Sequence, residues 1–347
     1  MINNELLQQQ NSEEQEELYE HFRFVIDKGQ GSIRIDKYLT QRIENISRSK
    51  IQAAADAGSI LVNDHPVKPS YKIKPDEIIS VVLAFPPRET EIIPENIPVS
   101  ILYEDEGIIV VDKPAGMVVH PAHGNFSGTL VNALSWHLKD HSGYESGEIR
   151  PRLAHRIDKD TSGILVVAKT EFALSKLAKE FFDHTISRRY QALVWGEFQD
   201  DEGTITGNVG RSLRDRKVMD VFPEGDQGKH AVTHYKVIER FRYTTLVECI
   251  LETGRTHQIR VHMKYAGHPL FGDAAYGGDR ILKGTVFSKY KQFVDNCLAG
   301  LPRQALHAAF LGFKKPSDGT KIEFSSPLPE DMEKAIVRWR EYSKQKM

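Results

Sequence analysis

The residues best suited to chemistry in this chain are the polar side chains of residues 155–163, which directly precede an apolar run. Their sequence is His-Arg-Ile-Asp-Lys-Asp-Thr-Ser-Gly, and residues 164–168 continue it as Ile-Leu-Val-Val-Ala. Such an apolar run predicts a strand buried on both faces, so Asp158, between Arg156 and Lys159, would lie at the edge of a core. Asp158 is therefore a candidate catalytic group. The alternative is a turn whose Asp and Ser side chains bind their own backbone.

Metal-binding and phosphate-binding motifs do not occur at their usual spacings. The chain has 14 histidines, but no His-Glu-x-x-His motif occurs, and His257 and His262 are not spaced as metal ligands on a helix. The chain also has neither G-x-G-x-x-G nor G-x-x-x-x-G-K-[ST]. We therefore expect no metal ion, nucleotide or other cofactor.

What remains is a single carboxylate near several cations. The segment Thr-Gly-Arg-Thr-His-Gln-Ile-Arg at 253–260 predicts the start of a helix and supplies Arg255 and Arg260. A neighbouring guanidinium favours an ionised carboxylate, which suits a nucleophile or an electrostatic partner better than a general acid. The spacing leaves open which arginine is the partner. Asp160 projects to the opposite side of an extended chain, so we assign it, with Thr161 and Ser162, to shaping the turn.

Residues 32–84 predict a compact α/β unit of two helices followed by strands. Apolar residues recur at helical spacing from Ile35 to Ile43, and Ser47 is typical of the cap of a second helix that ends at Gly58. Four basic residues lie in or beside these helices: Arg34, Lys37, Arg48 and Lys50. Such residues suit phosphate contacts, although charge alone is more typical of a solvated surface.

Residues 99–345 predict a second, larger domain, joined to the first by a proline-rich linker at 85–98. Strands are expected around 101–103, 108–111, 164–168, 188–196, 234–238, 246–251, 307–313 and 321–325, and residues 113–121 are expected to form strand, turn and strand. Helices are expected at 129–137 and 173–182, and after Pro329. Many strands, few helices and no β-α-β alternation predict an α+β fold with a largely antiparallel mixed sheet flanked by helices.

Composition sets limits on the class of protein. With 347 residues and 40% apolar content, the chain is long enough for two domains with large cores. The net charge is -2, but residues 1–22 hold several glutamates and no Lys or Arg. We expect these residues to be a disordered acidic extension, which leaves a modestly basic remainder that is compatible with a polyanionic ligand.

Cysteine use and the N-terminal sequence indicate the compartment. Cys249 and Cys297 are the two cysteines, far apart in sequence. We expect both to be reduced thiols, one in a strand and one in a helix. Neither a signal peptide nor an apolar run of membrane-spanning length is evident, so we expect a cytoplasmic protein with no membrane contact.

Two parts of the chain resemble known families. Residues 34–39, 47–51 and 58–63 carry R-I-D-K-Y-L, S-R-S-K-I and G-S-I-L-V-N, and the whole unit resembles the RNA-binding fold named after the fourth protein of the small ribosomal subunit. Residues 155–169, 188–196, 253–263 and 267–276 resemble the RluA/RluD-type pseudouridine synthases, as do 111–122 and 303–308. The family most often has Leu where Ile157 stands, a swap of equal volume that should leave the chemistry unchanged.

The resemblance implies an isomerase that detaches uracil from ribose in RNA, turns the base and rejoins it through carbon five. It implies that Asp158 is the catalytic aspartate. Three roles for this carboxylate stay open: attack on the sugar, addition to the base, or removal of a ribose proton. Tyr190 would lie against the uracil and assist loss of the carbon-five proton, and Arg260 would pair with Asp158. Arg156 would enter the base stack of the RNA helix, or bind a phosphate, while the target uridine flips out.

The resemblance also suggests the partners. Further RNA contacts are expected from Arg255, His120 and the four basic residues of residues 32–84. The expected substrate is large-subunit (23S) ribosomal RNA or its assembly precursor, with transfer RNA as the alternative, and we expect a monomer. The chemistry requires no metal and no cofactor.

Two other functions fit the sequence less well. In a phosphohydrolase with an Asp-x-Asp pair, an apolar strand runs into the first Asp, whereas here the strand follows Asp158. A non-catalytic ribosome-binding protein would be favoured by loss of Asp158 or Tyr190, and both are present.

Overall fold

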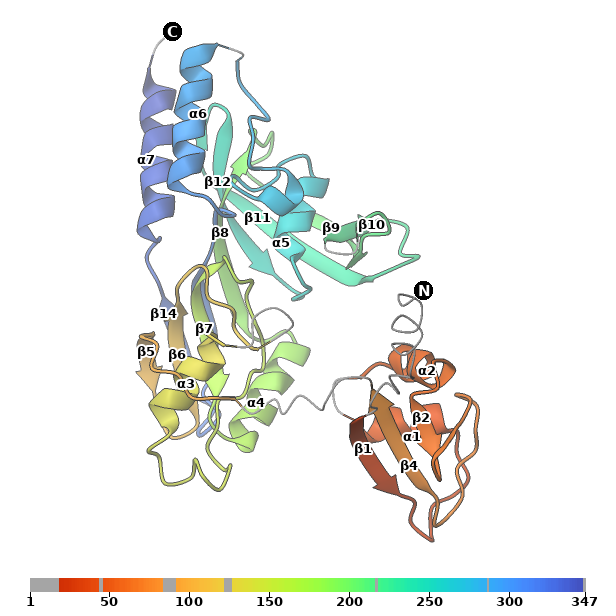
Figure 1. Cartoon of the computed structure of the whole chain (residues 1–347). Coiled ribbons are helices and arrows are strands. Elements are labelled where there is room, and N and C mark those ends of the chain that lie inside the picture. The colour runs from red at the N-terminus through yellow and green to blue at the C-terminus, as the bar shows by residue number, and fades with distance from the viewer. Residues whose placement is uncertain are drawn as a thin grey trace, which may run out of the picture. The chain divides into compact units, whose positions relative to one another are not determined.

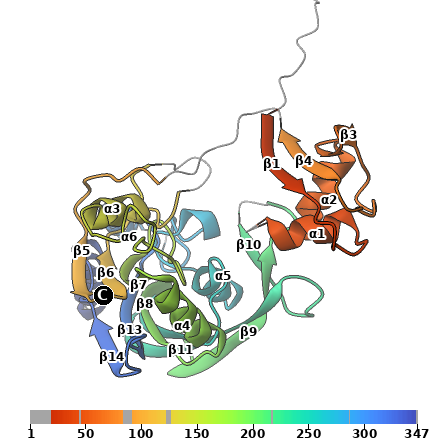
Figure 2. The ribbon, with the colours of Figure 1, turned by 90° about the horizontal axis from the view of Figure 1, so that it is seen from below.

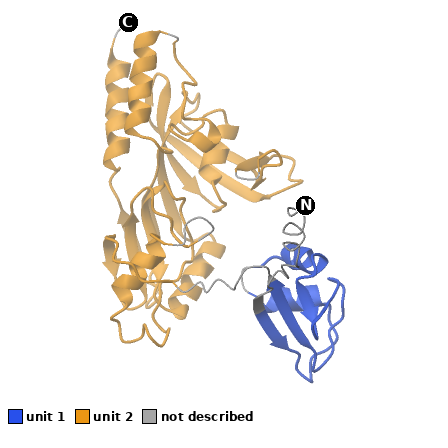
Figure 3. Cartoon of the chain, in the orientation of Figure 1, with its two compact units in different colours: residues 1–91 blue, residues 92–347 orange. Residues whose placement is uncertain are grey.

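The computed structural model describes residues 19–43, 46–83, 92–121, 127–215, 218–285 and 287–345. The chain divides into two compact units, residues 1–91 and 92–347 (Figure 3). Each unit has its own cluster of buried apolar side chains. Residue 84 and residues 85–91 of the expected linker lie outside the described residues.

The first unit is a four-stranded sheet with two helices. Its elements are β1 (Tyr19–Val25), α1 (Ile35–Arg42), α2 (Arg48–Asp56), β2 (Ile60–Val62), β3 (His65–Pro66) and β4 (Ile78–Leu83), and the strand order is β1-β4-β2-β3 (Figure 1). Ile35, Leu39 and Ile51 are fully buried between the helices and the sheet. The hydroxyl of Ser47 accepts from the backbone N–H of Lys50, which confirms the predicted helix cap.

The first strand corrects one prediction. Residues 1–22 were expected to be disordered, but residues 19–25 form β1, which pairs antiparallel with β4. Phe24 packs edge-on against Tyr38, with ring centroids 6.2 Å apart. The glutamates of the segment obscured an alternation of aromatic and polar residues that is typical of a strand with one buried face. Residues 1–18 lie outside the described residues.

The second unit is built on a ten-stranded, largely antiparallel sheet, as predicted. Its strand order is β10-β9-β11-β12-β8-β13-β7-β6-β5, with β14 paired to β13. The strands are β5 (Ser100–Glu104), β6 (Ile108–Lys113), β7 (Ser162–Ala168), β8 (Ser187–Trp195), β9 (Glu202–Arg211), β10 (Met219–Phe222), β11 (Lys229–Phe241), β12 (Thr244–Leu251), β13 (Leu306–Lys314) and β14 (Lys321–Ser325). The helices are α3 (Leu130–Leu138), α4 (Glu171–Phe182), α5 (Gln258–Tyr265), the single turn η1 (Ala274–Tyr276), α6 (Ser288–Gly300) and α7 (Glu330–Lys344).

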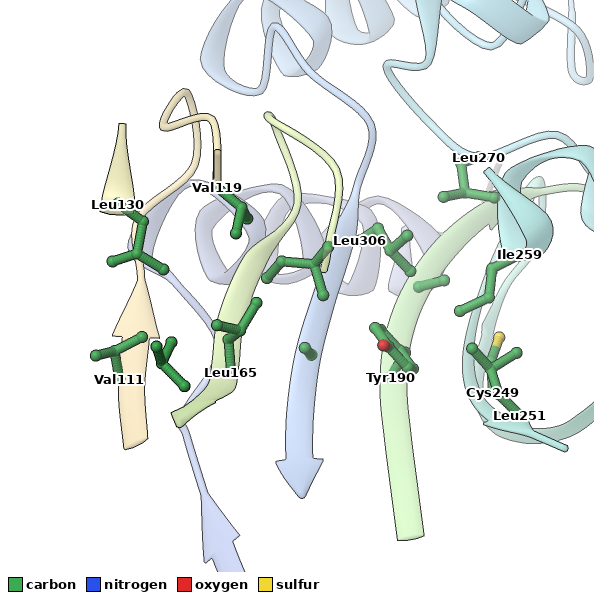
Figure 4. Close-up of a cluster of buried hydrophobic side chains, with 14 of the residues drawn as sticks. Val111, Val119, Leu130, Leu165, Tyr190, Cys249, Leu251, Ile259, Leu270 and Leu306 are labelled. Atoms are coloured by element: carbon green, nitrogen blue, oxygen red, sulfur yellow. The ribbon is translucent and has the colours of Figure 1, made fainter. Parts of the chain in front are cut away.

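Helices cover both faces of the sheet at β7, which explains the continuous apolar run after residues 155–161. Leu165 and Val167 belong to the same buried cluster as Leu130 of α3, and Leu165 and Leu130 are labelled in Figure 4. Ile164 and Val166 belong instead to the cluster that contains Leu177 of α4; both helices are labelled in Figure 2. Every residue of β7 is buried. The start of β7 is thereby fixed from both sides, and β13 runs parallel to it at His307 and Ala308.

The opposite end of the sheet carries α6 and α7. Trp195 of β8 packs against Phe271 and the α7 residue Trp339, with ring centroids 5.2 and 5.9 Å away. Cys297 is buried in α6 and Cys249 in β12, and both are free thiols, as expected. Within the described part of the chain, no helix is long and apolar enough to cross a membrane.

One local prediction for this unit was wrong. Residues 113–121 were expected to form strand, turn and strand, but only the first strand, β6, is present, and the rest of the segment is irregular as far as Pro121. Lys113 explains part of this shape, because its ammonium group binds the backbone carbonyls of Pro114 and Met117 at 2.8 Å each. These bonds bend the chain back towards the end of β6.

Candidate active site

The predicted catalytic motifs meet at one cavity of ≈ 550 Å³. Its wall is formed by the loop that precedes β7, the end of α4, the start of β8 and the segment from the end of β12 into α5. Pockets of about 300–1,000 Å³ are typical of ligand sites. Five of the predicted residues line this cavity: Asp158, Tyr190, Arg260, Arg156 and Arg255.

Asp158 is held at the wall of this cavity by an ion pair. Its Oδ2 lies 3.1 Å from Nη1 of Arg260, and its side chain is 20% exposed. Arg260 lies on the first turn of α5, the helix predicted from residues 253–262. Asp158 is the only carboxylate among the described residues that line the cavity. The guanidinium of Arg260 therefore fixes the position of this carboxylate in the wall.

Arg260 is itself fixed by a second carboxylate. Its Nε and Nη2 donate to the two oxygens of Asp273 at 2.7 and 2.8 Å. The side chain of Asp273 is fully buried, and Oδ1 also accepts from the backbone N–H of Tyr276. Burial lowers the pKa of Arg260, but the hydrogen bonds and charge of Asp273, with the charge of Asp158, outweigh it and raise that pKa above its ordinary value. The guanidinium therefore stays charged.

His257 also approaches Asp158, at the same carboxylate oxygen as Arg260. Its Nε2 is 3.9 Å from Asp158 Oδ2, and its Nδ1 is 3.0 Å from the hydroxyl of Tyr276. Its backbone is left-handed, with φ 57, a conformation that costs energy for a residue other than glycine. Burial lowers the pKa of His257, although the charge of Asp158 opposes this shift. The neutral imidazole is thus favoured near neutral pH.

Tyr190 forms the apolar part of the wall. It lies on β8 opposite Cys249 of β12 and Ala308 of β13, and is 7% exposed (Figure 4). Burial raises the pKa of Tyr190; Arg188 lowers it and Asp158 raises it further. The phenol therefore keeps its proton at neutral pH, and its ring offers a flat apolar surface within the cavity.

The turn that carries Asp158 is held by its backbone. The N–H of Thr161 donates to the carbonyl of Asp158 at 3.1 Å. Lys113 donates to the carbonyl of Lys159 at 2.9 Å, and Arg303 donates to that of Asp160 at 2.9 Å. Two cations from distant strands and loops thus fix the turn without contacting the carboxylate of Asp158.

The structure separates the two arginines that the sequence left open. Arg255 Nε donates to the carbonyl of His230 at 3.1 Å, whereas Arg260 contacts Asp158. The side chain of Arg255 still lines the cavity, as does the exposed side chain of Arg156. Both therefore remain candidates for contacts with a ligand.

The remaining predicted RNA contacts do not line this cavity. His120 is exposed, and its Nδ1 lies 2.9 Å from the carbonyl of Pro121. In the first unit, Arg34 and Arg48 both bind the buried Asp36, each at 2.9 Å. These bonds lower the pKa of Asp36. Two arginines expected to bind RNA thus also fix α1 to α2.

Two exposed lysines of the first unit, Lys37 and Lys50, complete the predicted set. Three further residues around the cavity, Arg188, His257 and Asp273, were not predicted. Each lies within a segment that carries the family resemblance, but roles had been given only to other residues, such as Tyr190 beside Arg188 and Arg260 beside His257. Asp273 is 13 positions from Arg260 in sequence, and only the fold shows that they pair. No group of three or more His, Cys, Asp or Glu side chains suited to a metal ion occurs among the described residues.

Comparison with known proteins gives the family. The family model described as RNA pseudouridylate synthase matches residues 107–265, and the S4 domain model matches residues 33–79. An uncharacterized RNA pseudouridine synthase of Chlorobaculum parvum is 48% identical over 317 residues, which cover 91% of this chain and 96% of the relative. Ribosomal large subunit pseudouridine synthase D of Zymomonas mobilis is 43% identical over 307 residues, which cover 86% of this chain and 92% of the relative.

Solved structures support the fold. Human RNA pseudouridylate synthase domain containing 4 superposes with a TM-score of 0.53 at 22% identity, covering 70% of this chain and 93% of that one. The α+β fold and the family resemblance predicted from the sequence are confirmed. The chain belongs to the RluA/RluD-type RNA pseudouridine synthases, which makes it an isomerase that acts on RNA, with an S4 domain at its N-terminal side.

Proposed function

We propose that this enzyme isomerises uridines of large-subunit ribosomal RNA, with Asp158 as the catalytic group. The observation that carries the proposal is the ion pair of Asp158 and Arg260 in the wall of a ≈ 550 Å³ cavity that Tyr190 also lines. The choice of RNA is supported by relatives from Zymomonas mobilis and Neisseria meningitidis, which are named ribosomal large subunit pseudouridine synthase D and are 43% and 42% identical.

The reaction exchanges one bond of the uridine for another. The bond between ribose C1′ and uracil N1 breaks, a bond between C1′ and C5 forms, a proton leaves C5, and N1 gains a proton. The carboxylate of Asp158 suits attack on the sugar, addition to the base or removal of a ribose proton, because each of these steps needs an electron-pair donor. Arg260 holds that carboxylate in place.

Tyr190 is proposed to hold the base while it turns. The uracil would lie against the phenol ring, which is a wall of the cavity and is fixed by the strands on either side. Because the pKa of Tyr190 is raised by burial, its hydroxyl is a poor base in its protonated form. The ring is therefore assigned the positioning of the base, so that C5 faces C1′ of the ribose when the new bond forms.

The target uridine must leave its helix to reach this cavity. A base inside a duplex is not accessible to a carboxylate in a protein cavity, so the nucleotide must flip out. Arg156 is exposed at the cavity and precedes Asp158 by two residues. We propose that Arg156 fills the space that the flipped uridine leaves in the RNA helix, or binds a phosphate beside it. Arg255 would contact the adjoining RNA.

The test is a comparison of pseudouridine maps. Ribosomal and transfer RNA would be mapped from cells with the gene, without it, and without it but supplied with the Asp158→Asn variant. We expect one or a few large-subunit sites to be lost on deletion and not restored by the variant. Loss confined to transfer RNA would overturn the proposed target, and restoration by the variant would overturn the role of Asp158.

A further inference from the structure

Arg188 is a buried cation whose charge is not balanced by a carboxylate. It lies on β8, two residues before Tyr190, and is 7% exposed. Its Nε has no hydrogen-bond partner, and no carboxylate of the described residues forms an ion pair with it. Burial lowers the pKa of Arg188, and the interaction with Tyr190 opposes this shift only in part. A buried guanidinium without a partner is costly, so its position calls for a ligand.

The guanidinium of Arg188 is held at the cavity wall by its neighbours. Its Cζ lies 5.3 Å from the ring centroid of Phe181 on α4, a cation–π contact. A Cβ on Gly254 would lie 2.7 Å from its Nη1, so the glycine provides the space that the guanidinium occupies. Both Arg188 and Gly254 line the cavity that holds Asp158. The group is thus placed beside the proposed site of reaction rather than on an outer surface.

The charges around the cavity specify what kind of ligand would pair with Arg188. Four arginines line it, against the single carboxylate of Asp158, and Arg260 already binds that carboxylate. The uncompensated charge therefore favours an anion. In an enzyme that acts on RNA, the anion available next to a flipped nucleotide is a phosphodiester of the same strand.

We propose that Arg188 binds a phosphate of the substrate RNA next to the flipped uridine, and so positions that nucleotide for Asp158. The inference rests on the proposed function, because it takes the cavity to be the uridine site. Arg188 contacts the strand and not the reacting atoms, so its main effect is on binding and placement. A planar guanidinium can give a phosphate two parallel hydrogen bonds, which fixes orientation as well as distance.

The test compares Arg188→Met with Arg189→Met. Arg189 is the next residue of β8, but it packs on Phe310, 3.8 Å from its ring centroid, and lies near Glu248. Both variants would be assayed for KM and kcat on a 23S ribosomal RNA transcript, and for binding to oligouridylate at several salt concentrations.

For Arg188→Met we expect affinity for oligouridylate to fall about tenfold or more. The slope of log affinity against log salt should become shallower by about 0.7, the loss of one phosphate contact. Arg189→Met should match the wild type.

Two further variants separate a phosphate contact from a structural role. Arg188→Lys keeps the charge and should recover part of the affinity and the salt slope. Gly254→Ala keeps the arginine but displaces it, and should weaken binding in the same direction as Arg188→Met. The thermal midpoint of Arg188→Met should equal or exceed that of the wild type, because a buried charge without a partner is removed.

The outcomes are distinct. The inference is overturned if Arg188→Met binds oligouridylate with wild-type affinity and salt slope, or if it unfolds at a clearly lower temperature while its folded fraction binds normally. If the wild-type enzyme leaves the 23S transcript unmodified, the proposed target fails, but the oligouridylate titration still decides whether Arg188 contacts phosphate.

Discussion

Arg260 holds Asp158 with only one of its nitrogens. Nη1 lies 3.1 Å from Asp158, whereas Nε and Nη2 are committed to the fully buried Asp273 at 2.7 and 2.8 Å. The guanidinium is therefore fixed in place by Asp273, and Asp158 meets a cation that need not reorganise when the substrate binds. Electrostatic groups that are positioned before the reaction contribute most to catalysis, because no energy is spent on aligning them.

Replacing Asp158 by Asn should abolish pseudouridine formation and leave RNA affinity within about tenfold, because loss of the reacting group affects the chemical step more than binding. Pseudouridine yield and RNA affinity would be measured on the same transcript. Asp160→Asn is the matched control: it is two residues away, does not line the cavity, and should remain active. Substantial activity in Asp158→Asn would exclude the proposed mechanism.

Replacing Arg260 by Met should cost stability as well as activity. The change leaves Asp273 buried without its cation, and breaking a buried ion pair in this way costs about 3–5 kcal/mol. The free energy of unfolding would be taken from the urea transition of the larger unit, alongside kcat. Arg255→Met should unfold near the wild-type urea concentration, because Arg255 pairs with a backbone carbonyl. Equal effects of the two substitutions would contradict the anchoring role of Asp273.

The sequence was sufficient to predict local features that depend on neighbouring residues. The cap at Ser47, the buried strand β7 and the helix α5 all follow from short patterns, and the structure contains each of them. Family resemblance identified Asp158, Tyr190 and Arg260, which the fold brings to one cavity.

Features that depend on distant pairing were not predictable in the same way. The choice between Arg255 and Arg260 required the path of the chain after β12, and the support from Asp273 required the loop that follows α5. The strand β1 was missed because its identity depends on pairing with β4, and the local glutamates favoured disorder. Arg188 was missed because burial without a partner can be recognised only in three dimensions.

Lys113 should make stability depend on pH. Burial lowers its pKa from the ordinary value of 10.5 to about 7, with the charges of Asp160 and Asp158 opposing the shift. The unfolded chain therefore binds more protons than the folded one between about pH 7 and 10.5, so the free energy of unfolding should rise with pH across this range. The cost of burying the charge is fully present below about pH 7 and is relieved above it.

Urea unfolding of the wild type and of Lys113→Met at pH 7 and pH 9 would measure this contribution. Only the wild type should gain stability from Lys113 as the pH rises. The free energy of unfolding of the wild type, relative to that of Lys113→Met, should therefore be higher at pH 9 than at pH 7. Parallel changes would show that the three backbone carbonyls around Nζ keep Lys113 charged up to pH 9.

Removing residues 1–84 should weaken RNA binding or broaden the choice of sites while leaving the cavity intact. The first unit has its own core, and the described residues that line the cavity of Asp158 all belong to the second unit. We expect kcat on an accessible uridine to be retained and KM for ribosomal RNA to rise, if the exposed basic residues of this unit contact the RNA backbone as we predict.

Charge substitution in the full chain distinguishes binding from folding in this unit. Lys37→Glu with Lys50→Glu changes two exposed side chains, whereas Asp36→Asn removes the buried carboxylate that Arg34 and Arg48 share. The lysine pair should weaken RNA binding at an unchanged unfolding temperature, because exposed charges contribute little to stability. Asp36→Asn should instead lower the stability of the unit, because it removes the anion between two cations. Unchanged ribosomal RNA modification by both the truncated chain and the lysine variant would show that the first unit is dispensable for substrate choice.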